Sequence, residues 1–197
     1  MFRKSPFCII QILIVIPMML LSLSTSTYAK NKDFDSPCFD ISLVSHLNLV
    51  TKVEKNNGFY LYVFASSNKD NAELQTRIIV SNKKPEAGQS LEDFQTTSIG
   101  AMSVMFVEAY KLYQYMDTPE NRKVLSRKPY KLSLGGTTFS GATMYFGNID
   151  ASFLVVRPND KTYAVTLVSQ NSNEQIRKKN LEMLKEQLQS IKFKSCA

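Results

Sequence analysis

The sequence contains few of the residues that usually carry out chemistry. Its 197 residues include no Trp, a single His and three Cys. The seven Gly and seven Pro argue against low-complexity linkers. A composition of 44% hydrophobic and 21% charged residues excludes a disordered tail, a collagen-like fibre and a polytopic membrane protein. The length predicts one ordinary domain beside a targeting segment.

Residues 1–29 have the three parts of a secretory signal peptide. Arg3 and Lys4 precede an apolar stretch, and a short polar region ends at Ala29. An uncleaved anchor helix is the alternative, because the stretch is close to the length that crosses a bilayer. A glutamine and a proline interrupt it. We expect cleavage after Ala29, export to the periplasm or the medium, and no stable membrane span afterwards.

Cleavage would leave two cysteines, Cys38 and Cys196, near the two ends of the chain. In an oxidising compartment this pair predicts a disulfide. It closes a loop of 158 residues (196 minus 38), which the chain-entropy model values at about 4 to 5 kcal/mol. Two unpaired thiols are the alternative. Two thiols and one distant His have no ligand spacing typical of metal sites, so we expect no metal and no cofactor.

The rest of the chain predicts a polar leader at residues 30–38 and a single α+β domain at residues 39–197. Apolar runs of strand length, bounded by turn residues, predict most of a mainly antiparallel sheet. The runs are 59–65, 74–81, 128–134, 138–146, 151–156 and 162–168. A further strand is expected near 39–43, and alternation from Ala109 onward predicts another.

Two segments have the spacing of helices. The first begins at Ser90, and Asp93 three residues later is placed to reach back toward this cap. The second runs from Asn173 to about Ser190, with Ser172 expected as its cap. Helices separated from an antiparallel sheet predict a layered α-β-α sandwich.

The glycines at 136 and 141 have the spacing of a phosphate loop. Such a loop needs a lysine directly after the second glycine, and Ala142 stands there instead. We therefore interpret this segment as a strand with turn glycines.

Four short segments resemble the PsbP-like superfamily. They are Ser90–Phe94, Leu134–Gly136 followed by Gly141–Ala142, Tyr163–Leu167, and Ser190–Phe193. The resemblance covers roughly residues 74–193, and the superfamily includes bacterial envelope proteins of the DcrB type. It implies an α-β-α sandwich that binds a partner through a sheet face or loops. It implies no catalytic residues, because the family shares no catalytic set.

Positive charge is concentrated in residues 122–131, which we call the basic segment. Its five cations are Arg122, Lys123, Arg127, Lys128 and Lys131, and no acidic residue lies between Glu120 and Asp150. On one surface these side chains would attract anionic lipid head groups, acidic glycans or an acidic protein. A solvated hairpin is the alternative. The run 177–179 near the start of the last helix opposes the helix dipole and suggests a second basic contact.

We therefore expect an exported, non-enzymatic binding or accessory protein of the bacterial envelope or the medium. A protein or anionic envelope component is its expected partner, and nucleic acid is not, because the chain is exported. The alternative is a secreted effector or hydrolase acting on host or envelope material. That alternative needs a serine close to His46, the one imidazole in the sequence.

Overall fold

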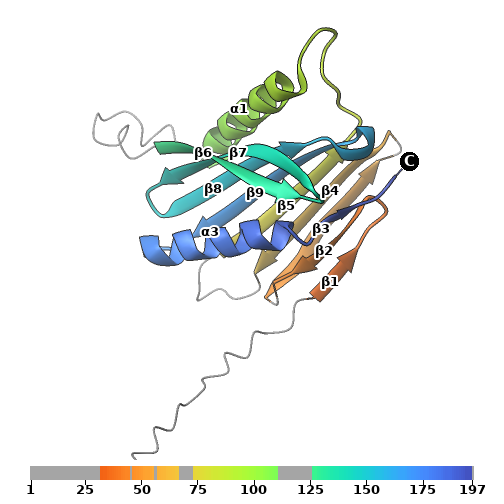
Figure 1. The fold of residues 1–197 in the computed structure, drawn as a ribbon. Coiled ribbons are helices and arrows are strands. Elements are labelled where there is room, and N and C mark those ends of the chain that lie inside the picture. The colour runs from red at the N-terminus through yellow and green to blue at the C-terminus, as the bar shows by residue number, and fades with distance from the viewer. Residues whose placement is uncertain (1–31, 45, 56, 67–72, 111–125, 197) are drawn as a thin grey trace, which may run out of the picture.

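The computed structural model describes residues 32–44, 46–55, 57–66, 73–110 and 126–196. Within them, seven strands form a sheet in which every neighbouring pair is antiparallel (Figure 1). Its strand order is β3-β4-β5-β9-β8-β7-β6. The strands are β3 (Leu47–Lys55), β4 (Phe59–Ser66), β5 (Glu73–Ser81), β6 (Ser126–Leu134), β7 (Thr137–Phe146), β8 (Ile149–Val156) and β9 (Thr162–Gln170).

A smaller sheet of three strands, β1 (Lys32–Asp35), β2 (Phe39–Leu43) and β10 (Lys192–Phe193), joins the two ends of the described chain. The polar leader expected at residues 30–38 is therefore wrong from residue 32 onward. The ring of Phe34 lies 4.9 Å from that of Phe64, and Cys38 is fully buried. A single apolar residue among charged ones has no period, so the sequence pattern did not indicate this strand. The predicted signal peptide lies outside the described residues.

The two α-helices within the described residues cover opposite faces of the large sheet (Figure 1). Helix α1 (Leu91–Ala109) packs on β7 and β8, with Phe94 and Phe106 in the core beneath it. Helix α3 (Glu174–Leu188) and the small sheet cover the other face, where Tyr62 and Leu154 are fully buried. The predicted layered α+β sandwich with a mainly antiparallel sheet is confirmed.

The helix ends show which local signals were correct. The hydroxyl of Ser90 accepts a hydrogen bond from the backbone N–H of Asp93 at 3.0 Å, as the capping pair predicted. The strand expected from Ala109 is wrong at its start, because Tyr110 caps α1 and stacks on Phe106 at 4.5 Å between ring centroids. Asn173, not Ser172, caps α3. The amide oxygen of Asn173 accepts hydrogen bonds from the backbone N–H groups of Gln175 and Ile176.

One close approach explains a glycine inside β7. Gly141 pairs with Tyr130 of β6, and a Cβ atom at this position would lie 2.4 Å from the ring of Tyr130. The Nζ atom of Lys185 also contacts this ring, at 4.4 Å from the ring centroid. The tyrosine hydroxyl donates to the carbonyl of Phe153 at 3.4 Å. Gly141 is therefore a packing requirement of the sheet and not part of a phosphate loop.

We expect Gly141→Ala to lower the free energy of unfolding by about 1 to 3 kcal/mol, because the added methyl group must displace a ring that other contacts hold in place. The matched control is Gly100→Ala inside α1, where a Cβ meets nothing within 4 Å. That change should raise the free energy of unfolding by about 0.5 to 1 kcal/mol, through helix propensity. Urea denaturation of both variants measures the difference. Equal effects of the two substitutions would contradict the packing role of Gly141.

Candidate functional site

The basic segment is only partly within the described residues. Arg122 and Lys123 lie outside them, and the backbone of Arg127 pairs with Met144 in the sheet. Lys128 and Lys131 are both exposed on β6. Because successive side chains of a strand point to opposite faces, an odd separation places these two lysines on opposite faces of the sheet. The single basic surface expected from the sequence is therefore wrong for Lys128 and Lys131.

Lys128 instead faces a cavity of about 300 Å³ between the sheet and the start of α3. We call this the lysine cavity. Its described lining is Lys128, Tyr145, Phe146, Gly147, Asp150, Glu174, Arg177 and Lys178. The Nζ atoms of Lys128 and Lys178 lie 5.5 Å and 5.8 Å from the centroid of the Tyr145 ring. The two basic runs noted in the sequence therefore meet over one aromatic ring.

The inner wall of the lysine cavity holds a buried ion pair. The Nε atom of Arg177 donates to Oδ1 of Asp150 at 3.1 Å, with side chains 8% and 0% exposed. Arg177 also donates to the carbonyl of Asn171 at 2.7 Å, which fixes the guanidinium against the strand end. Burial raises the pKa of Asp150, and the hydrogen bond from Arg177 opposes that rise. The pair holds the first turn of α3 on β8.

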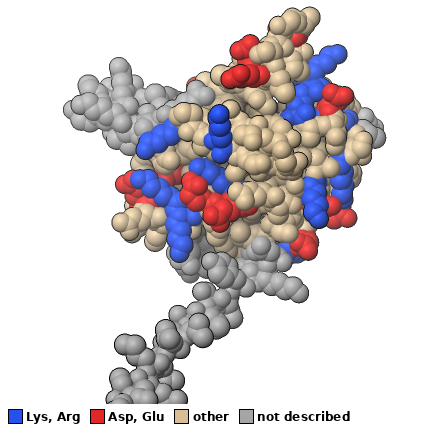
Figure 2. Space-filling view, viewed as in Figure 1, with Lys and Arg blue, Asp and Glu red and all other residues tan. Residues whose placement is uncertain are grey.

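The outer wall is more adaptable. Lys178 donates to Glu174 one helical turn earlier, and both side chains are exposed. The hydrogen bond to Lys178 lowers the pKa of Glu174, and the same bond raises the pKa of Lys178. Exposed pairs of this kind are weak. Lys178 can therefore exchange Glu174 for an anionic ligand at little cost. Figure 2 shows cationic and anionic side chains intermixed over the region of α3.

Sequence reasoning did not single out Tyr145 or Asp150. They are directly opposite each other in the β7–β8 hairpin, and the one sequence signal was the Gly147-Asn148 turn between them. A turn signal places two residues opposite each other, but it does not show that α3 lies above them.

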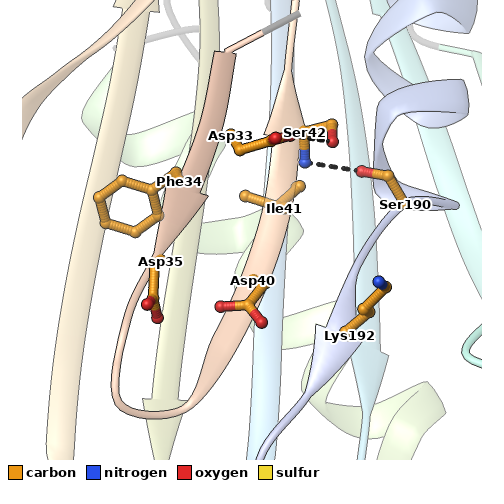
Figure 3. Close-up of a pocket in the computed structure, with 8 residues that line it drawn as sticks. All are labelled: Asp33, Phe34, Asp35, Asp40, Ile41, Ser42, Ser190 and Lys192. Carbon is orange, nitrogen blue, oxygen red and sulfur yellow. Dashed lines mark hydrogen bonds between the residues drawn. The ribbon is translucent and has the colours of Figure 1, made fainter.

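A second hollow, of about 430 Å³, lies beside the small sheet (Figure 3). Figure 3 shows the ring of Phe34 pointing away from the carboxylates that line this hollow. Asp33 accepts from the hydroxyl of Ser42 at 2.6 Å, and Asp35 and Asp40 both pair with Lys194. The hydrogen bond from Lys194 lowers the pKa of Asp35. These carboxylates hold the terminal strands together, and the described residues contain no group suited to a metal ion.

The hydrolase alternative depends on His46, which lies exposed in the turn between β2 and β3. Ser45 beside it lies outside the described residues. In the part of the chain that the structure describes, no helix is long and apolar enough to cross a membrane.

The structure contains the disulfide expected from the sequence. It joins Cys38 to Cys196, whose Cα atoms are 4.9 Å apart.

Comparison with known proteins finds a similarity to solved structures. No protein-family model matches the chain, and no curated protein matches it. Among solved structures, the chain is similar to PsbP (CyanoP) of the cyanobacterium Synechocystis sp. PCC 6803, with 14% sequence identity and a TM-score of 0.47. The match covers 89% of this chain and 99% of that chain. Membership among DcrB-type envelope proteins stays a prediction.

We expect Arg177→Met to lower the free energy of unfolding at pH 7 by about 3 kcal/mol, because Asp150 is left buried and ionised without its partner. Removing the guanidinium raises the pKa of Asp150 further above its ordinary value of 3.8. The folded variant then binds a proton more tightly than the unfolded chain. The loss of stability relative to the wild type therefore shrinks as the pH falls from 7 through the raised pKa, and this difference levels off below about 3.8.

Urea denaturation between pH 3 and pH 7 tests this pH dependence. Lys179→Met is the matched control, because Lys179 is exposed on the same helix, and its effect should stay below about 1 kcal/mol at every pH. A loss in Arg177→Met that is the same at pH 4 and pH 7 would contradict the proposed role of the ion pair.

Proposed function

We propose that the chain is an exported, disulfide-bonded and non-catalytic binding or accessory protein of the bacterial envelope or the medium. It binds the anionic groups of its partner at the lysine cavity. The observation that carries this proposal is the meeting of Lys128 and Lys178 over the ring of Tyr145. Export is supported by the signal-peptide pattern of residues 1–29 and by the disulfide, which is typical of oxidising compartments.

The charge of the whole molecule favours the same kind of partner. Without Arg3 and Lys4, the chain keeps 22 of its 24 basic residues against 17 acidic ones, a net charge of +5. A positive protein attracts anions over about 10 Å at ordinary ionic strength, and this attraction speeds encounter. Specific binding needs fixed cations at one place, and the lysine cavity supplies them.

We expect the double variant Lys128→Glu, Lys178→Glu to lose retention on a column of immobilised acidic polysaccharide at 0.1 M salt, where the wild-type protein is retained. The control is Lys131→Glu, Lys179→Glu, which changes the net charge equally. Lys131 lies on the same strand as Lys128, and Lys179 is exposed on the same helix as Lys178. Attraction by net charge alone would lower the retention of both variants equally, and this result would contradict the lysine cavity as the binding site.

Export is tested by the non-reduced intact mass of the native protein from the periplasm and from the medium. We expect the mass of residues 30–197 less two hydrogens, because cleavage follows Ala29 and the two remaining cysteines are joined. Recovery of this mass mainly from the medium would direct the partner search outside the cell. An uncut mass in the membrane fraction would contradict the proposed export.

A further inference from the structure

The lysine cavity carries one unit of net positive charge. Among the described residues that line it, Lys128, Arg177 and Lys178 are cationic, and Asp150 and Glu174 are anionic. A ligand with one negative charge balances this set. A carboxylate has that charge at neutral pH, whereas a phosphate monoester carries about −1.5 to −2. A zwitterion has no net charge to offer. The charge count therefore favours a monocarboxylate.

A second observation indicates what else the ligand carries. The Oδ2 atom of Asp150 is buried and has no hydrogen-bond partner among the described residues, and the same is true of the hydroxyl of Ser169. Asp150 lines the lysine cavity, and Ser169, which is not among its described lining residues, is directly opposite Asp150 on β9. Side chains in such positions have Cβ atoms about 4.5 to 5.5 Å apart. Unpartnered buried polar atoms cost free energy until a partner reaches them.

The carboxylate oxygen of Asp150 and the hydroxyl of Ser169 need different hydrogen-bonding groups from a ligand. An ionised carboxylate oxygen can only accept a hydrogen bond, and a serine hydroxyl can either donate or accept one. An alcohol hydroxyl donates to Asp150 and accepts from Ser169, so one group can satisfy both atoms. An ammonium group has no lone pair to accept with, and it would also leave a net positive charge in the cavity.

We propose that the lysine cavity binds a sugar acid, a monocarboxylate that also carries hydroxyl groups. Its carboxylate lies between Lys128 and Lys178 beside the Tyr145 ring, and one of its hydroxyls reaches Asp150 and Ser169. This assignment rests on the proposed function, because it names the ligand class of the same site. The sugar acid is either a free molecule or one residue of an acidic glycan.

The test is a calorimetric titration of the disulfide-bonded protein at pH 7 with three probes: sodium D-glucuronate, sodium acetate and D-glucose. Acetate has the carboxylate alone, and glucose has the hydroxyls alone. We expect D-glucuronate to bind at least tenfold more tightly than either of the other two. Shifts of the Tyr145 ring resonances in NMR spectra should accompany its binding.

Variants test the carboxylate contacts and the hydroxyl contacts of the site separately. Lys128→Met and Lys178→Met should each weaken D-glucuronate binding at least tenfold, and the controls Lys131→Met and Lys179→Met should leave it unchanged. Ser169→Ala should reduce the preference for D-glucuronate over acetate and leave acetate binding as it is. This small change at a buried site keeps the fold, which the circular dichroism spectrum checks.

Equal affinities for D-glucuronate and acetate would overturn the sugar-acid assignment, while retention on the polysaccharide column would leave the proposed function standing. D-glucuronate binding that is unaffected by Lys128→Met and Lys178→Met would place the ligand elsewhere and also overturn the assignment. Oligogalacturonate separates the two sources of the ligand. Tighter binding of the oligomer than of the monomer supports a glycan, and tighter binding of the monomer supports a free sugar acid.

Discussion

The attachment of Cys38 to the C-terminal segment and to β9 of the large sheet supports the rest of the structure. Its sulfur is bonded to Cys196 near the C-terminus. Its carbonyl oxygen accepts from the hydroxyl of Tyr163, in the large sheet, and from the backbone N–H of Lys194, both at 2.8 Å. Burial raises the pKa of Tyr163 to about 12, so its hydroxyl stays protonated and remains a donor at neutral pH. One residue therefore joins both chain ends to the centre of the fold.

This attachment positions α3, and α3 completes the lysine cavity. Near its C-terminal end, the hydroxyl of Ser190 accepts from the backbone N–H of Ser42, and the amide oxygen of Gln187 accepts from that of Val44. At its N-terminal end, Arg177 holds the helix to Asp150 on β8. The helix is thus fixed at both ends over the sheet. The distance of Lys178 from the Tyr145 ring depends on both attachments.

Much of the fold was predictable because its signals are local. The strands have aromatic and β-branched residues between turn residues, and Ser90 caps α1 through a hydrogen bond to a residue only three positions away. The exceptions lack such a signal. Strand β1 depends on Phe34 meeting Phe64, which is thirty positions further along the chain, and Tyr110 ends a helix where alternation alone favoured a strand. The candidate site was predictable only in its basic residues, Lys128, Arg177 and Lys178.

The sequence by itself determined the basic-then-apolar pattern of residues 1–29, the presence of two cysteines after it, the alternation of the strands and the positive charge, because each is a property of neighbouring residues or of composition. The tertiary structure decided which charges share a surface. Strand alternation separates Lys128 from Lys131, and the packing of α3 brings Lys178 to Lys128 and places Arg177 on Asp150. Contacts between distant segments depend on how a helix lies on a sheet, and no local pattern specifies that.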